Sequence, residues 1–128
     1  MTKGRYSYLS RFIEVSGVSL HYLEWETDGP PVVIVHGNSH AGGVFAPLGE
    51  RLSDAFHLYA IDMRGHGLSD KPYDPRDYTM PALVGDLLVV LDTYLLDTVL
   101  YAGYSLGGRG LSFSGCNSTS CHTFFLVK

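Results

Sequence analysis

Two short and wholly apolar runs, residues 32–35 and 99–102, constrain the fold of this chain most strongly. An uninterrupted apolar run of this length is typical of a strand that is buried on both faces of a parallel sheet. Further strands are predicted at residues 12–15, 18–25 and 56–61, and helices near residues 45–52 and 83–91, the second with Thr79 as its N-cap. Strands that alternate with helices predict the α/β class, with a mostly parallel, twisted sheet and flanking helices.

Polar loops that contain glycine follow three of these strands. They begin at His36, at Asp62 and at Ser105, each directly after or close to the end of an apolar run. In a parallel sheet the carboxyl ends of the strands share one edge, and functional residues gather there. The sequence therefore predicts a functional site that draws on all three loops.

The third loop carries the pattern Gly-x-Ser-x-Gly, from Gly103 through Tyr104, Ser105 and Leu106 to Gly107. After a buried strand and before a helix, this pattern is typical of a sharp turn that raises a nucleophilic serine above the sheet. The glycines are needed because side chains beside the serine would clash in so tight a turn. At the start of the next helix, the backbone N–H of Leu106 can face a developing oxyanion. A structural Gly-Ser turn is the alternative interpretation.

Residues 12–110 resemble the N-terminal half of an α/β-hydrolase. The resemblance rests on His36-Gly37, on Asp62-x-Arg64-Gly65-x-Gly67-x-Ser69 and on the Ser105 turn. It implies a serine nucleophile at Ser105, oxyanion donors at the N–H groups of Asn38 and Leu106, a small-molecule substrate, and no metal or organic cofactor. Haloalkane dehalogenases and epoxide hydrolases of this fold carry Asp at the nucleophile position, so the resemblance favours esterases, lactonases, carbon–carbon bond hydrolases or cofactor-free peroxidase-like members.

Other residues of these motifs have a structural and a functional interpretation. In the family the histidine at position 36 usually supports the oxyanion loop, although direct substrate contact is the alternative for His36. Gly37, Gly103 and Gly107 are expected to shape the loop and the turn. Tyr104 and Leu106 are expected to line the pocket or to pack. For Asp62, Arg64 and His66 we expect hydrogen bonds from side chain to backbone that stabilise their loop, rather than catalysis.

The residues after the turn depart from the family. The family's acid and base follow the nucleophile, but no Asp or Glu follows Ser105, and His122 is the one later histidine. We therefore expect residues 1–110 to be the N-terminal portion of an α/β-hydrolase domain, an incomplete fold truncated before the acid and base, and residues 111–128 to be a disordered segment unrelated to the family. The strand before Ser105 would then be an exposed apolar edge, and the chain alone would be inactive. The alternative is a non-catalytic truncated isoform or frameshifted fragment with no enzymatic role.

Charge and composition exclude several other classes. The net charge is −4 with no basic block, which argues against a nucleic-acid or membrane partner. The longest apolar runs fall far short of the ~20 residues of a membrane-spanning helix. No signal peptide is recognised, and two cysteines make no disulfide framework, so a cytoplasmic location is expected. Cys116, Cys121 and His122 are too few for a metal site, and none is predicted.

Overall fold

The computed structural model describes residues 7–94, 99–107 and 123–127. The elements follow the alternation that the apolar runs predict. In chain order they are β1 (Leu9–Val15), β2 (Val18–Trp25), β3 (Pro31–Val35), η1 (Gly42–Phe45), α1 (Ala46–Leu52), β4 (His57–Ile61), η2 (Pro75–Tyr78), α2 (Met80–Thr93), β5 (Leu100–Tyr104) and β6 (Thr123–Val127).

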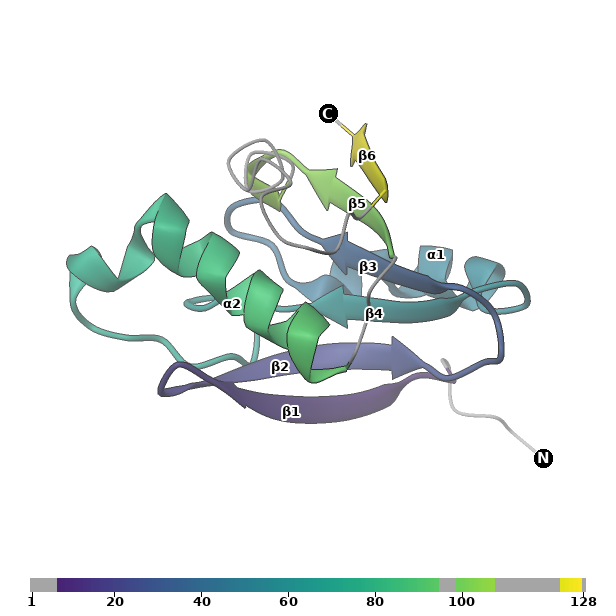
Figure 1. Cartoon of the computed structure of the whole chain (residues 1–128), viewed down its shortest axis with the longest axis horizontal. Coiled ribbons are helices and arrows are strands. Elements are labelled where there is room, and N and C mark those ends of the chain that lie inside the picture. The colour runs from purple at the N-terminus through teal and green to yellow at the C-terminus, as the bar shows by residue number, and fades with distance from the viewer. Residues whose placement is uncertain (1–6, 95–98, 108–122, 128) are drawn as a thin grey trace.

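One sheet joins all the strands in the order β1-β2-β4-β3-β5-β6 (Figure 1). β1 pairs antiparallel with β2, and β2 pairs antiparallel with β4. The pairs β4–β3, β3–β5 and β5–β6 are all parallel. The predicted fold class, a mostly parallel sheet with flanking helices, is confirmed.

The order in which successive strands are added to the sheet reverses at β3. β4 is added on one side of β3 and β5 on the other, so the loops that follow β3 and β5 start from neighbouring strand ends. Ligands of open α/β sheets bind at such a switch point, outside the carboxyl ends of the strands. The topology thus brings the loop after His36 next to the turn at Ser105.

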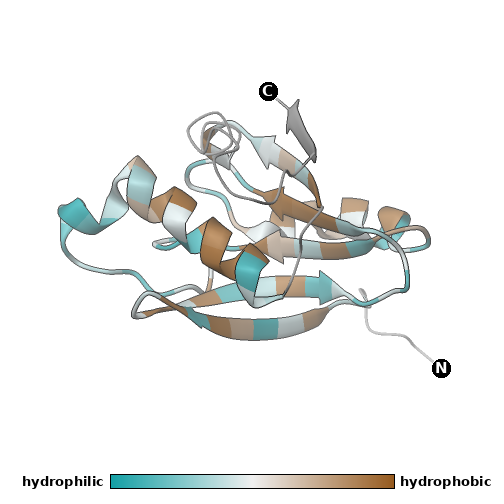
Figure 2. Cartoon of the chain, viewed as in Figure 1, coloured by the Kyte–Doolittle hydropathy of each residue, from teal (hydrophilic) through white to brown (hydrophobic). Residues whose placement is uncertain are grey.

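The two helices cover opposite faces of the sheet (Figure 1). On one face Leu87, Val90 and Leu91 of α2 pack in a cluster with residues of β2 to β5. On the other face Ala46 of α1 packs with Trp25 and with alternate residues of β3 and β4. Figure 2 shows β3 as an almost continuous apolar segment between these layers, which explains why its sequence shows no polar alternation.

The start of α2 is fixed by the predicted cap. The Thr79 hydroxyl accepts a hydrogen bond from the N–H of Ala82 at 3.3 Å, and a proline lies in the first turn. Proline suits this position because its missing N–H has no partner within the helix. In the part of the chain that the structure describes, neither α2 nor any other helix is long and apolar enough to cross a lipid bilayer.

β6 is the main difference from the sequence-based expectation. Most of residues 111–128 lies outside the described residues, but Thr123–Val127 forms a strand that pairs with the whole of β5. For these residues the structure differs from the expected disorder and unpaired apolar end, and β5 is not the free edge that we expected. The physical reason is that a run of β-branched and aromatic residues has high strand propensity, and an unpaired β5 would leave a row of free N–H and C=O groups.

Candidate functional site

The turn between β5 and the next helix places Ser105 as the sequence predicts. Ser105 has φ +53°, a left-handed conformation that is uncommon outside glycine, and Leu106 and Gly107 are already helical. At Gly107 an added Cβ would lie 2.4 Å from the carbonyl oxygen of Val35, so a larger residue does not fit. The buried Tyr101 hydroxyl donates a hydrogen bond to the Gly107 carbonyl at 2.9 Å. The turn is therefore held tightly against β3.

A cavity of about 340 Å³ opens at this turn. Three of the predicted site residues line it together, namely Ser105, Asn38 and Leu106. Its other lining residues are His66, Tyr78, Met80 and Leu83, the last two from the first turns of α2. An apolar wall with a few convergent polar groups is the usual character of a small-molecule site.

His36 supports the loop that carries Asn38. It is fully buried, its Nδ1 donates to the carbonyl of Gly37 at 2.7 Å, and its Nε2 accepts the N–H of Met63 at 3.0 Å. One donating and one accepting nitrogen describe a neutral imidazole, and burial lowers the pKa of His36 accordingly. Because the Gly37–Asn38 peptide is planar and trans, holding its carbonyl also directs the Asn38 N–H the opposite way.

Gly37 and Tyr104 form the contact between the loop and the turn. A Cβ added to Gly37 would lie 3.0 Å from the Tyr104 ring and 3.3 Å from the Cβ of Ser105. Tyr104 is 39% exposed and stacks on His40 with ring centroids 6.0 Å apart. It lies outside the cavity lining, so packing is the interpretation that its position supports. Gly103 is buried in β5 opposite Val35.

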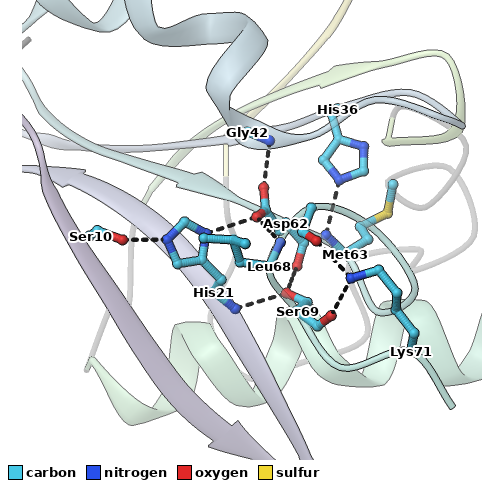
Figure 3. Close-up of polar contacts among 10 residues, drawn as sticks. Ser10, His21, His36, Gly42, Asp62, Met63, Leu68, Ser69 and Lys71 are labelled. Atoms are coloured by element: carbon cyan, nitrogen blue, oxygen red, sulfur yellow. Dashed lines mark hydrogen bonds and ion pairs between the residues drawn. The ribbon is translucent and has the colours of Figure 1, made fainter. Parts of the chain in front are cut away.

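The carboxylate of Asp62 joins the loop after β3 to the loop after β4 (Figure 3). Its Oδ1 accepts the N–H of Gly42 at 2.6 Å, and its Oδ2 accepts the N–H of Leu68 at 3.0 Å. Nδ1 of the buried His21 lies 2.8 Å from Oδ2, and the Ser69 hydroxyl donates to the Asp62 carbonyl at 2.6 Å. The expected stabilising role of Asp62 is thus visible, but its partner His21 was not predicted.

Arg64 makes the second connection, to α2. Its Nε and one terminal nitrogen donate to the two oxygens of Asp86, each at 2.6 Å, and the other terminal nitrogen donates to the Asp77 carbonyl at 2.9 Å. The Asp86 hydrogen bonds raise the pKa of Arg64. Asp86 was missed by the sequence analysis, although a carboxylate at helical spacing within the apolar face between Leu83 and Val90 is a signal for a buried ion pair.

The Ser105 hydroxyl has no hydrogen-bonded base among the described residues. Among the side chains that the structure describes, none hydrogen-bonds the Ser105 hydroxyl. His122, Cys116 and Cys121 lie outside the described residues. Within the described part of the chain there is also no group of three His, Cys, Asp or Glu side chains that could hold a metal ion. The geometry thus assembles a serine and two candidate oxyanion donors, without a hydrogen-bonded proton acceptor for the serine among the described residues.

Comparisons with known proteins agree with this architecture. A family model described as the alpha/beta hydrolase fold matches residues 30–112. The 2-(acetamidomethylene)succinate hydrolase of Mesorhizobium japonicum is 36% identical over 105 residues, which is 80% of this chain and 36% of that protein. A pimeloyl-[acyl-carrier protein] methyl ester esterase of Stenotrophomonas maltophilia is 39% identical over 80 residues (62% of this chain, 28% of the esterase), and epoxide hydrolase 1 of Caenorhabditis elegans is 30% identical over 100 residues (77% and 25%).

Solved structures share the fold over nearly the whole chain. E-2-(acetamidomethylene)succinate hydrolase superposes with a TM-score of 0.80 at 31% identity, covering 91% of this chain and 42% of its own. An alpha/beta hydrolase from Novosphingobium aromaticivorans gives a TM-score of 0.86 at 26% identity, covering 96% and 45%. The chain thus spans less than half the length of these relatives. The family model and the sequence identity to these relatives show that the chain belongs to the α/β-hydrolase fold family.

Proposed function

We propose that Ser105 is the nucleophile of a hydrolase that acts on a carboxylic ester or a related acyl or carbon–carbon substrate. The observation that carries the proposal is the position of Ser105, in a left-handed turn that lines a cavity together with Asn38 and Leu106. A small-molecule substrate fits a cavity of about 340 Å³.

The chemistry follows from these positions. The Ser105 Oγ attacks the acyl carbonyl, and its proton passes to a base. The N–H groups of Asn38 and Leu106 bind the oxyanion, and loss of one such donor typically costs about 10²–10³ in turnover. The leaving group departs with a proton, and water then hydrolyses the acyl-enzyme and frees Ser105.

The identity of the residue at the turn supports acyl chemistry over epoxide opening. The relatives include an epoxide hydrolase as well as an esterase and a succinate hydrolase, so family membership alone leaves the reaction open. Members of the fold that open epoxides carry Asp at the nucleophile position, whereas this chain has Ser105. A serine forms an acyl-enzyme that water can hydrolyse.

Activation of Ser105 depends on an acid and a base that the described residues do not supply. In this family both follow the nucleophile, and the residues described after Ser105 contain neither. We expect the 128-residue chain alone to show no turnover, because a serine without an oriented imidazole is a poor nucleophile. The second candidate, a non-catalytic role for the chain, is supported by the same observation.

A fluorophosphonate probe tests the proposal, because it labels an activated serine. Residues 1–110 would be fused to the part of the Mesorhizobium relative that lies beyond the matched segment. In this family the acid and the base follow the nucleophile, so we expect that part to supply them. We expect labelling of Ser105 in the fusion and none in the 128-residue chain.

Two variants of the fusion serve as comparison. Ser105→Ala removes the labelled hydroxyl, and Ser53→Ala, at the far end of α1, leaves the site intact. Equal labelling of the Ser105→Ala variant would show that the nucleophile is assigned wrongly. A fusion that unfolds cooperatively and yet takes up no label would favour the non-catalytic role.

A further inference from the structure

We propose that His66 is a positioning residue for the oxyanion loop, which it holds through the side chain of Asn38. This inference rests on the proposed function, because it assigns His66 to the residue whose N–H is the expected oxyanion donor. His66 belongs to the loop after β4, and it lines the same cavity as Ser105.

His66 is itself fixed on several sides. Its Nδ1 lies 3.0 Å from the carbonyl oxygen of Arg64, and its backbone N–H and C=O bond to Met63 and Ser69, each at 3.0 Å. Its ring packs on His36 with centroids 4.8 Å apart. Because a carbonyl oxygen only accepts, Nδ1 must carry the proton. The other nitrogen, Nε2, is left for a second partner.

That second partner is Asn38. The Nε2 of His66 lies 3.4 Å from the side-chain oxygen Oδ1 of Asn38. With the amide turned this way, Nε2 donates to Oδ1 from the protonated ring; for the neutral ring the amide turns by 180°, so that its NH₂ group donates to Nε2. His66 therefore keeps a partner in Asn38 in either protonation state, which suits a residue whose task is to hold the loop.

Asn38 needs such a contact because burial does not hold it. Asn38 and Ser39 are both exposed, and Ser39 has φ +63°. His36 fixes the peptide before Asn38 through the Gly37 carbonyl, and His66 fixes the side chain of Asn38 itself. Together the two histidines determine where the Asn38 N–H points. A wrongly directed donor affects a tetrahedral oxyanion more than a planar carbonyl, since the oxyanion depends on it for charge stabilisation.

Two substitutions separate the contacts of the two ring nitrogens. His66→Asn places an amide near the position of Nδ1, so it can keep the bond to the Arg64 carbonyl but cannot reach Asn38. His66→Gln extends the amide to the position of Nε2, so it can still bond to Asn38. If His66 only stabilised its own loop through the Arg64 carbonyl, His66→Gln would be the more affected variant and His66→Asn the less affected one.

Binding of two small probes to the 128-residue chain gives the readout, by NMR titration. Propylphosphonate is a tetrahedral anion, and butanamide presents a planar carbonyl. We expect His66→Asn to bind propylphosphonate about two- to tenfold more weakly than the wild type, the range of one lost hydrogen bond, with butanamide affinity unchanged. His66→Gln should stay within about twofold of the wild type. Urea unfolding of each variant checks that it is folded.

Other outcomes would overturn the assignment. Equal loss of propylphosphonate binding in both variants would mean that the imidazole ring itself matters and not its contact with Asn38. Retained binding in His66→Asn, or no propylphosphonate binding to the wild type, would also refute the positioning role. The Ser105→Ala variant should show the same His66 dependence, so this test and the labelling of Ser105 can fail independently.

Discussion

Asp62→Asn is the substitution whose effect the structure defines best. The change keeps the shape of the side chain but replaces one carboxylate oxygen by an NH₂ group. Oδ1 accepts one N–H, from Gly42, and Oδ2 accepts a backbone N–H from Leu68 and faces Nδ1 of His21. Whichever way the new amide turns, its NH₂ group faces at least one donor that has lost its acceptor.

The expected cost follows from burial and charge. Asp62 and His21 are 3% and 4% exposed, so water does not replace the lost contacts. An unsatisfied buried donor costs about 1–3 kcal/mol, and hydrogen bonds to a charged group are worth about 1.5–3 kcal/mol each. We expect Asp62→Asn to lower the free energy of unfolding by about 3–5 kcal/mol, the sum of one lost hydrogen bond to the charged carboxylate and one unsatisfied buried donor.

Urea unfolding at pH 7 measures this difference, with Asp70→Asn as the matched control. Asp70 is exposed, and its Oδ2 also accepts a backbone N–H, from Ser19 at 2.8 Å. The new amide oxygen can still accept this N–H and water reaches the site, so Asp70→Asn should cost no more than about 0.5–1.5 kcal/mol. If Asp62→Asn costs no more than Asp70→Asn, the carboxylate does not hold the two loops together and our interpretation of the network is wrong.

Three further predictions concern other parts of the fold. Burial lowers the pKa of His36. The stability that comes from its neutral form is therefore present above the ordinary histidine pKa of about 6.5 and is lost as the pH falls through the lowered pKa. Urea unfolding from pH 7.5 to 4.5 should show this loss of stability, and an equal dependence on pH in His36→Asn would contradict the prediction. Gly107→Ala forces a Cβ to 2.4 Å from a β3 carbonyl oxygen and should lower the free energy of unfolding by about 1–3 kcal/mol. Gly85→Ala, in open space within α2, should raise it by about 0.5–1 kcal/mol. Thermal unfolding should therefore show a lower midpoint for the first variant and a higher midpoint for the second. The backbone N–H groups of alternate residues of β6 bond to β5. Only one of Phe124→Pro and Phe125→Pro should therefore remove a hydrogen bond between the strands and speed amide hydrogen exchange in β5. Equal exchange rates in the two variants would contradict the pairing of β6 with β5.

The elements of the fold were predictable because their causes are local. The apolar runs before His36 and Ser105 favour strands inside a sheet, and the Thr79 cap fixes the start of α2. The glycine pattern around Ser105 predicts the sharp turn, since backbone sterics allow few other residues there. The prediction that the loop of His36 meets the turn at Ser105 also followed, because the carboxyl ends of parallel strands share one edge.

The tertiary structure alone decided which distant polar groups meet. The pairs of Asp86 with Arg64 and of His21 with Asp62 join segments that are 22 and 41 residues apart, and no local pattern encodes such a distance. The same holds for His66, which reaches Asn38 only because the loops after β3 and β4 lie side by side. β6 shows most clearly what local sequence cannot predict. Its sequence gives strand propensity, but whether a strand forms depends on a free neighbouring edge, and that edge exists only once β5 is in place beside β3.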